Sequence, residues 1–439
     1  MKFSDLLDLL PEPGGVPASA LADDLALITA VSPELADAPL PAADAAALAR
    51  GYVAHRARPV TAVVLTANEE ERIAACLTAL ADDVDHCLLI DSGSTDGTAE
   101  QALRARPGTR ILSAPWADDF SRQRNLAFGE VTEGWLCHVD ADEVLVAAHA
   151  GRLRRALCLL DYLLAGRDLV VSPVIADQGG PVYTNTQRVL RADGSFRFRG
   201  PVHEHPYTPD GLAPPRVQVD VRFDHFGYLP EVIDERRKRE LYVRLDRLAR
   251  ATEPDNPKWV YYEVRDGLDP AASEEEVRSA FALLASATGD TAPDRPGYRT
   301  ERTVDSWSLL CELAVRLGDG DALRTYPALL AKAGREVEAT YYRTLVESSR
   351  LLGRLSALVD SITAVESAEE PANRHLMGRL YELQSTLALA SGRYETVVPA
   401  YRKATARGAG RSVTEDFGML AGVLAETGGG AGSRPRPAG

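Results

Sequence analysis

The stretch from Trp135 to Leu145 constrains the fold most, because an apolar run ends there in three carboxylates, Asp140, Asp142 and Glu143. Strands of a parallel sheet are buried on both faces and read as apolar runs, and open α/β sheets bind ligands beyond the carboxyl ends of such strands. On extended chain Asp140 and Asp142 would point the same way and could face one hard cation. The alternative is an acidic loop after a strand, because a short acidic motif alone is unspecific.

The composition is that of a globular protein. The chain has 439 residues, of which 45% are hydrophobic and 26% charged, enough for two or three domains. A net charge of −15 argues against nucleic acid or an anionic membrane as partner, so an anionic substrate would need a local basic pocket. Five scattered cysteines favour reduced core thiols. With no signal peptide and no apolar run that could span a bilayer, we expect a cytoplasmic protein.

Changes in residue pattern divide the chain into four parts. Residues 1–57 carry short helical patterns broken by Pro and Gly, which predict an N-terminal helical extension. Residues 58–229 alternate β-branched runs with helical segments, which predicts an α/β domain. From 230 to 426 helical periodicity takes over, and Leu387–Ala404 resembles a tetratricopeptide hairpin or another helix pair. The Gly-rich tail, 427–439, is expected to be disordered.

The α/β part contains local signals for individual elements. A helix should open at Asn68–Arg72 and another should cover Phe120–Phe128. Gln187–Arg191 and Phe196–Arg199 alternate across an Asp-Gly turn and predict a hairpin. Strands are predicted at Val60–Thr66, Cys87–Ile90, Arg110–Ser113, Trp135–Val139 and Leu169–Ile175.

Four motifs in order along the chain carry a family resemblance. They are Thr66–Glu70, Asp91–Thr98, Asp119–Asn125 and Val139–Glu143. Together they resemble the family 2 inverting glycosyltransferases with a GT-A fold. Met1–Leu6, Phe198–Glu204 and Asn256–Trp259 are similar to the sublancin-type glycosyltransferases of the glycocin pathway. The likeness extends to about Trp259, and it implies transfer of a sugar to a cysteine sulfur of a ribosomally made precursor peptide, with a helical repeat domain after the catalytic one.

The resemblance implies a site for a UDP-sugar donor. Asp91 would accept a hydrogen bond from the uracil N–H, and Thr66 and Glu69 would line the base and ribose. The alternative for Asp91 is a helix cap. Arg124 and Arg188 would add bidentate contacts to phosphate, unless they are solvated surface side chains. Arg191 is a further candidate for the same role.

The resemblance also implies a divalent metal ion, Mg²⁺ or Mn²⁺. Asp142 would be the direct ligand, and Asp140 would contact the ribose or sugar and reach the ion through water. His225 would complete the metal site, although a histidine beside Phe226 could instead be a packed core residue. The ion would bridge the diphosphate and neutralise charge on the departing UDP.

Glu204 is the candidate catalytic base, because an inverting displacement needs an acceptor that loses its proton as it attacks C1. A thiol, with an unperturbed pKa of about 8.5, depends less on a base than a hydroxyl does. The alternative for Glu204 is a salt bridge to Arg197 or Arg199. His205 stands where the sublancin-type pattern carries an acidic residue, and Glu143 stands where it carries Asn. These two departures leave open how the acceptor fits and which sugar is transferred.

The sequence therefore predicts a hexosyltransferase of bacteriocin biosynthesis that uses a UDP-hexose, with UDP-glucose favoured, and modifies a precursor peptide on cysteine. One rival is a family 2 glycosyltransferase acting on a hydroxyl of a peptide, lipid-linked or small-molecule acceptor. A second rival is a non-catalytic, repeat-based binding protein. No nucleic acid or membrane is expected as partner, and the sequence leaves open whether the chain forms a homodimer.

Overall fold

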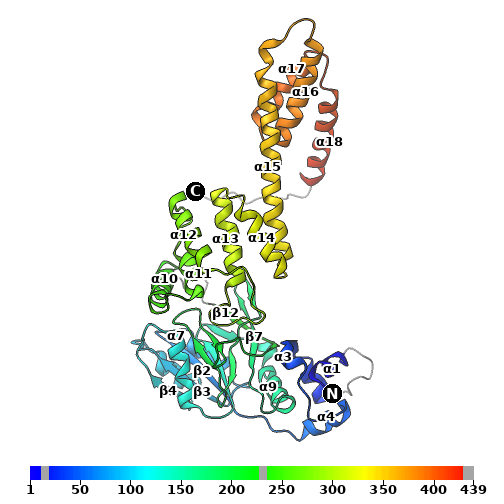
Figure 1. Ribbon diagram of the computed structural model, residues 1–439. Helices are drawn as coiled ribbons and strands as arrows, with labels where there is room; N and C mark the ends of the chain where they lie inside the picture. Colours follow the sequence, from blue (N-terminus) through cyan, green and yellow to red (C-terminus); the bar gives the residue numbers. More distant parts are fainter. Residues whose placement is uncertain (11–18, 227–234, 429–439) are drawn as a thin grey trace. The chain divides into compact units, whose positions relative to one another are not determined.

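The structure is a computed structural model that describes residues 1–10, 19–226 and 235–428 (Figure 1). Contacts divide the chain into two compact units, Met1–Leu313 and Ala314–Gly439, with the boundary inside helix α13 (Thr303–Leu317). The predicted start of the helical domain at residue 230 differs from this division. Three helices beyond that point belong to the first unit, namely α10 (Glu235–Thr252), α11 (Pro257–Gly267) and α12 (Glu274–Ala287). The tail predicted to be disordered lies, from residue 429, outside the described residues.

A ten-stranded mixed sheet forms the centre of the first unit. Eight strands follow the order β1-β12-β7-β9-β5-β2-β3-β4, and outside this path β6 pairs with β12 and β8 with β7. Strands β2, β3, β4 and β5 run parallel to one another, whereas β9 runs antiparallel to β5 and β7. The strands are β1 (Ile28–Val31), β2 (Val60–Thr66), β3 (His86–Asp91), β4 (Arg110–Ser113), β5 (Trp135–Asp140), β6 (Glu143–Leu145), β7 (Val170–Asp177), β8 (Val182–Tyr183), β9 (Val189–Arg191) and β12 (Arg216–His225). The five strands predicted from apolar runs are therefore present.

Both faces of the sheet are covered, which explains why the central strands β2 and β5 are mostly apolar and are buried at nearly every position. On β2, Val60, Ala62 and Val64 enter one large core cluster. Val63, between them, enters a second cluster on the opposite face. The surrounding helices are α5 (Ile73–Ala79), α6 (Thr98–Ala105), α7 (Phe120–Asn125), α8 (Ala127–Glu130), the single turn η1 (Ala147–His149) and α9 (Arg152–Leu163).

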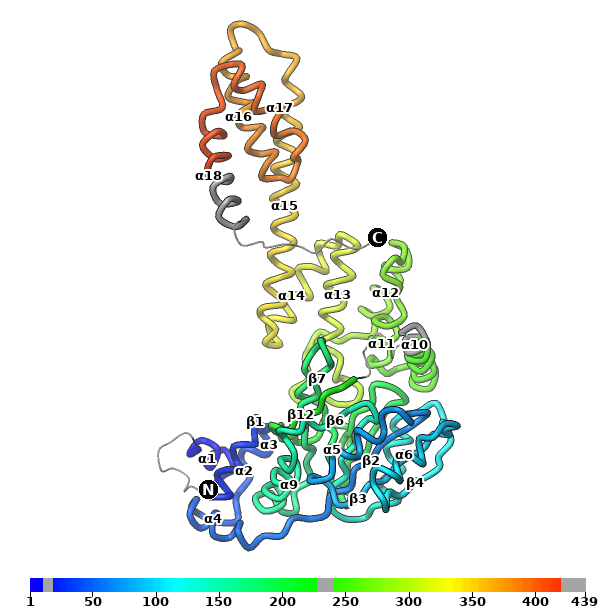
Figure 2. The backbone as a smooth tube through the Cα atoms, turned by 180° about the vertical axis from the view of Figure 1, so that it is seen from behind, coloured from blue at the N-terminus to red at the C-terminus, as the bar shows by residue number. Residues whose placement is uncertain are grey.

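The N-terminal extension is helical, as predicted, but it also contributes a strand. Its helices are α1 (Phe3–Asp8), α2 (Ala20–Leu25), α3 (Pro33–Ala36) and α4 (Ala45–Val53). Strand β1 pairs antiparallel with β12, with Ile28 opposite Val219. In both views the extension lies beside this edge, at the end of the sheet opposite β4 (Figures 1 and 2). The extension thus adds a strand to the sheet of the first unit.

Two local predictions were wrong in detail. Residues 68–72 are not helical, and α5 begins only at Ile73. Glu70 binds the loop after β3 instead, through its backbone N–H to Asp96 and its carboxylate to the Gly97 N–H. The predicted hairpin between Gln187–Arg191 and Phe196–Arg199 does not form. Strand β9 already pairs on both edges, with β5 and β7, so its neighbour β10 (Arg197–Arg199) pairs with β11 (His205–Tyr207).

The second unit consists of helices in the described residues. They are α14 (Ala322–Lys332), α15 (Glu336–Ala364), the single turn η2 (Glu366–Ala368), α16 (Arg374–Ala390), α17 (Tyr394–Thr405) and α18 (Arg411–Gly428). Helices α16 and α17 form the predicted tetratricopeptide-like hairpin, and Val359, Ala388 and Val397 pack α15, α16 and α17 together. Among the helices of the described residues, none combines the length and apolar character that crossing a membrane requires.

Candidate functional site

The acids predicted to bind a sugar nucleotide lie at one edge of the sheet. Strand β2 pairs in parallel with β3 on one side and β5 on the other, so Thr66 lies opposite Asp91 and Leu65 opposite Asp140. This register agrees with the sequence, because β2, β3 and β5 are apolar runs of similar length that each end in a polar residue. Asp91 and Asp140 therefore flank the end of β2, at the carboxyl edge where open α/β sheets bind ligands.

Asp91 organises the loop that follows β3. Its carboxylate accepts hydrogen bonds from the Ser94 backbone N–H at 3.2 Å, the Ser94 hydroxyl at 2.5 Å and the Thr66 hydroxyl at 3.4 Å. It does not cap α6, which begins at Thr98 after Gly97. The cap alternative for Asp91 is therefore wrong. The Glu69 backbone N–H donates to the Thr98 hydroxyl at 2.7 Å, which joins the two predicted donor loops.

Asp140 is held by two arginines. The Arg188 guanidinium binds it in bidentate fashion, at 3.2 and 2.7 Å, and Arg124 Nη2 donates to Asp140 Oδ1 at 2.9 Å. Although burial opposes its charge, Arg188 and Arg124 hold the pKa of Asp140 well below its ordinary value. Glu143 is buried between the Asp140 backbone N–H and Arg188, and burial raises its pKa to about 7. Both arginines are largely buried, so the surface alternative is wrong for them.

Glu204 joins this network from the loop between β10 and β11. Its Oε1 accepts a hydrogen bond from Arg124 Nε at 2.7 Å. The predicted alternative, a salt bridge to Arg197 or Arg199, does not form, because both arginines donate to backbone carbonyls instead. His205, the next residue, is half-buried, and burial lowers its pKa to about 4, so it is neutral at neutral pH.

Two of the three segments that narrowed the family resemblance, Phe198–Glu204 and Asn256–Trp259, pack against each other. Lys258, which is fully buried, donates to the His203 carbonyl at 3.1 Å and pairs with Glu301 at 3.1 Å. Gly200 has a φ of +106°, and a Cβ there would lie 3.1 Å from the Trp259 ring, so glycine permits both the backbone and the close approach. The start of α11 therefore supports the loop that carries Glu204.

His225 connects two carboxylates at the end of β12. Its Nε2 lies 3.3 Å from Asp142 Oδ2, and its Nδ1 lies 2.7 Å from Asp177 Oδ1. Burial disfavours the imidazolium, but the bonds to Asp142 and Asp177 outweigh it and raise the pKa of His225 to about 9. Asp177 was not predicted. Its only signal is its place just after the predicted strand Leu169–Ile175, and the register of β7 with β12 sets it opposite His225.

The extended conformation from which Asp140 and Asp142 were expected to face one cation does not continue past Asp140. Strand β5 ends at Asp140, and Ala141 and Asp142 form a turn, so the alternation of an extended chain does not continue. Asp142 and His225 do fit one metal ion. Their facing atoms are 3.3 Å apart, and neighbouring ligands of an octahedral ion bound at about 2.1 Å lie roughly 3 Å apart.

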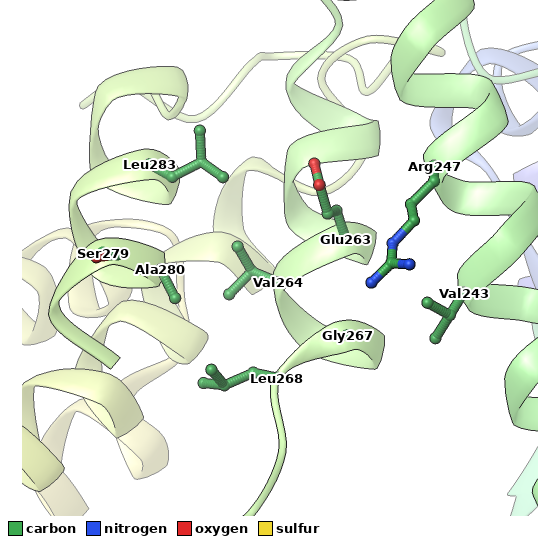
Figure 3. Close-up of a pocket in the computed structure, with 9 residues that line it drawn as sticks. All are labelled: Val243, Arg247, Glu263, Val264, Gly267, Leu268, Ser279, Ala280 and Leu283. Carbon is green, nitrogen blue, oxygen red and sulfur yellow. The ribbon is translucent and has the colours of Figure 1, made fainter. Parts of the chain in front are cut away.

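Arg191 is not part of the site. It lies opposite Trp135, at the far end of β5, where its Nη1 binds Asp161 at 2.7 Å and its guanidinium covers the Trp135 ring at 4.4 Å. A hollow of about 260 Å³ between α10, α11 and α12 also lies apart from the predicted residues, none of which line it (Figure 3). Its walls are mostly apolar, with Val264 between Leu283 and Val243 in the close-up.

Comparison with known proteins gives the class of this chain. Residues 61–199 match the family described as Glycosyl transferase family 2. That match and the mixed sheet with acids at its carboxyl edge define a glycosyltransferase with a GT-A catalytic domain, followed by a helical region. Over 365 residues the chain is 28% identical to the SPbeta prophage-derived glycosyltransferase SunS of Bacillus subtilis, aligning 82% of this chain and 83% of that relative. The predicted resemblance to the sublancin-type enzymes is thus confirmed.

Two further matches cover parts of the chain. A TPR repeat-containing protein of Synechococcus elongatus is 32% identical over 145 residues, which is 33% of this chain and 34% of that protein. The crystal structure of S. aureus TarS is similar with a TM-score of 0.33 and 14% identity, covering 61% of this chain and 54% of the other.

Proposed function

We propose that the protein transfers a hexose from a UDP-sugar to a cysteine sulfur of a ribosomally synthesised precursor peptide, with inversion at C1. UDP-glucose is the favoured donor. The similarity to SunS along most of both chains supports the peptide acceptor, and the ordered motifs support the nucleotide donor. In this proposal Asp91, Thr66 and Glu69 bind the uridine.

One observation carries the proposal: Arg124 binds Asp140 on one side and Glu204 on the other, at 2.9 and 2.7 Å. Asp140 ends the strand where a nucleotide-sugar is expected, and Glu204 lies on a loop from a different part of the chain. A single buried guanidinium thus fixes the donor side relative to the proposed base. Such preorganisation is what a displacement between two bound substrates requires.

The proposed chemistry is a single displacement. The cysteine sulfur attacks C1 as the bond from C1 to the UDP oxygen breaks, and the thiol proton passes to Glu204. Arg124 orients that carboxylate, and Arg188 keeps Asp140 in place for the sugar or ribose hydroxyls. Because a thiol ionises with a pKa of about 8.5, part of the acceptor needs no base at neutral pH.

A divalent ion, Mg²⁺ or Mn²⁺, would be held by Asp142 and His225 and would neutralise charge on the departing diphosphate. Asp177 would fix the His225 ring from its other nitrogen, as carboxylates commonly do for metal-binding histidines. Asp140 is not a direct ligand in this proposal, because two guanidinium groups contact its carboxylate and their positive charges would repel a cation there.

The helical second unit would bind the precursor peptide, because stacked helix pairs offer a long surface that a small acceptor does not need. We expect a shortened chain ending at Gly318 to keep UDP affinity and slow donor hydrolysis but to lose most peptide transfer. Calorimetry would follow UDP binding. If the shortened chain modified the precursor as fast as the full chain, the second unit would have another role.

The decisive experiment is mass spectrometry of a precursor peptide incubated with UDP-glucose and the full chain. We expect one hexose on a cysteine, no gain when that cysteine is replaced by serine, and loss of the product in EDTA with recovery in Mn²⁺. Transfer to the serine peptide at an equal rate would favour the rival hydroxyl acceptor. If the chain neither transferred the sugar nor hydrolysed the donor, with UDP-glucose or any other UDP-hexose, the result would favour the non-catalytic binding protein.

A further inference from the structure

A second histidine with two carboxylates lies where the Glu204 loop contacts the helices. His203 precedes Glu204 in the loop between β10 and β11, Asp246 comes from α10 and Asp266 from α11. His203 Nε2 lies 3.2 Å from Asp266 Oδ2 and 3.6 Å from Asp246 Oδ1. One ligand atom from each residue lies within 4.8 Å of the other two, and no other such group of three occurs in the described ranges.

Asp246 lacks the partners that a buried carboxylate needs. Its side chain is 1% exposed, and neither of its oxygens accepts a hydrogen bond. His203 Nε2 lies 3.6 Å from Asp246 Oδ1, which is beyond hydrogen-bond range. His203 Nε2 is also buried and, although it lies 3.2 Å from Asp266 Oδ2, it makes no hydrogen bond. Buried polar groups are almost always paired in native proteins, so these atoms point to a missing binding partner between them.

We propose that His203, Asp246 and Asp266 bind a divalent transition-metal ion, with Zn²⁺ the best fit. One imidazole nitrogen and two carboxylate oxygens suit zinc, whose ligands at about 2.0–2.2 Å in a tetrahedron lie roughly 3.3 Å apart. The separations of 3.2 and 3.6 Å match that spacing. Three protein ligands leave a fourth position for water.

The surroundings hold the ligands in place. Arg265 donates to both oxygens of Asp266, at 2.6 and 2.7 Å. A carboxylate oxygen has two lone pairs, so Oδ2 can still bind an ion. The Tyr262 ring stacks on the His203 ring at 3.7 Å with an interplanar angle of 8°, which fixes the plane of the imidazole. Supporting contacts of this kind are characteristic of metal sites.

The ion would anchor the Glu204 loop to α10 and α11. His203 has a φ of +50°, a backbone conformation that residues other than glycine rarely adopt. Surrounding contacts must therefore hold the loop in this conformation. The site is separate from Asp142 and His225 and would be structural. That the zinc ion would help to position Glu204 for transfer rests on the proposed function, whereas binding of the ion itself does not.

Zinc binding to the full chain, stripped with chelator and dialysed, tests the proposal. Calorimetric titration with Zn²⁺ compares the natural protein with Asp246→Asn and with Asp142→Asn, which alters the other histidine–carboxylate site. We expect one zinc site to disappear in Asp246→Asn and to remain in Asp142→Asn. At a free zinc concentration about 100 times the Kd, the melting temperature of the natural protein should rise by on the order of 5 °C. The melting temperature of Asp246→Asn should not rise.

Stability of the variant separates binding from folding. In metal-free buffer Asp246→Asn should melt no lower than the natural protein, because the change removes an uncompensated buried charge. If it does not fold, His203→Gln is used, with a loss of zinc affinity of about 100-fold expected. The proposal would be overturned if the folded variant bound zinc with the same stoichiometry and affinity as the natural protein. It would also be overturned if the natural protein had no zinc site other than the one that Asp142→Asn removes. Activity is not needed for either result.

Discussion

The two ends of strand β5 carry similar chemistry in different surroundings. At the carboxyl end, Asp140 is 33% exposed and shares Arg124 and Arg188. At the other end, Asp161 is 3% exposed and binds Arg191 and the Trp135 indole N–H. The first network is open to a ligand, whereas the second is enclosed by protein. The difference suggests that the open end serves transfer and the enclosed end serves stability, and substitutions at each end can test this.

The largest expected effect is at the open end. Asp142→Ala should lower transfer more than about 100-fold, because it removes the proposed direct metal ligand, while the melting temperature stays close to that of the natural chain. Turnover is measured by mass gain on the precursor in saturating Mn²⁺. Asp224→Ala is the matched control, since the Asp224 side chain is 26% exposed and pairs with Arg222. Near-normal turnover in Asp142→Ala would contradict the proposed role of Asp142 as a metal ligand needed for transfer.

Glu204→Gln should have the next largest effect. Glutamine can still accept the Arg124 hydrogen bond but cannot take a proton, so transfer to cysteine should fall by about 10- to 100-fold at neutral pH. As pH rises through about 8.5 the acceptor ionises without help, so the deficit should shrink. Rates are compared between pH 6.5 and 9. A deficit that stays constant over this range would argue that Glu204 only positions the acceptor.

Asp177→Asn should have a smaller effect that metal can reverse. Asp177 contacts His225 but is not a proposed ligand, so metal affinity should fall by about 10-fold, and excess Mn²⁺ should restore turnover. Titration of activity with Mn²⁺ gives the apparent affinity. A variant with lower turnover at every metal concentration would indicate a role for Asp177 other than orienting the histidine.

Arg191→Met should have the smallest effect on transfer and a large one on stability. It leaves Asp161 buried without its charge partner, which should lower the free energy of unfolding by about 3–5 kcal/mol. Urea denaturation gives the stability, and turnover is corrected for the folded fraction. Arg197→Met, at an exposed arginine that donates to backbone carbonyls and lies 4.0 Å from the Phe128 ring centroid, should change stability by about 1 kcal/mol or less. Lost turnover in folded Arg191→Met would break the contrast between the two ends.

Much of the sheet could be predicted because its signals are local. The run Val60–Thr66 is β-branched and apolar, and it forms β2 with those bounds. Asp91 and Asp140 end strands in the sequence and therefore meet at one edge of a parallel sheet. Strand β1 was missed because its β-branched run has only four residues and lies between the short helical patterns of α2 and α3.

The residues that were missed or misassigned depend on pairing between distant segments. Arg188 and Arg191 are three residues apart and looked alike, but β9 runs antiparallel to β5 and carries one to each end of that strand. Asp177 meets His225 only through the register of β7 with β12. The pattern of residues along one segment does not contain such a register.

The pairing of β1 with β12 has a consequence for synthesis of the chain. Ile28 cannot meet Val219 until roughly 190 more residues have been made, which takes about 10–40 s at 5–20 residues per second. During that time the segment has no sheet edge to join. Closing so large a loop is also slow in the complete chain, because non-local contacts form late. We therefore expect the last step of folding in the first unit to be the return of its earliest segment, and amide hydrogens of β1 to gain protection after those of β2.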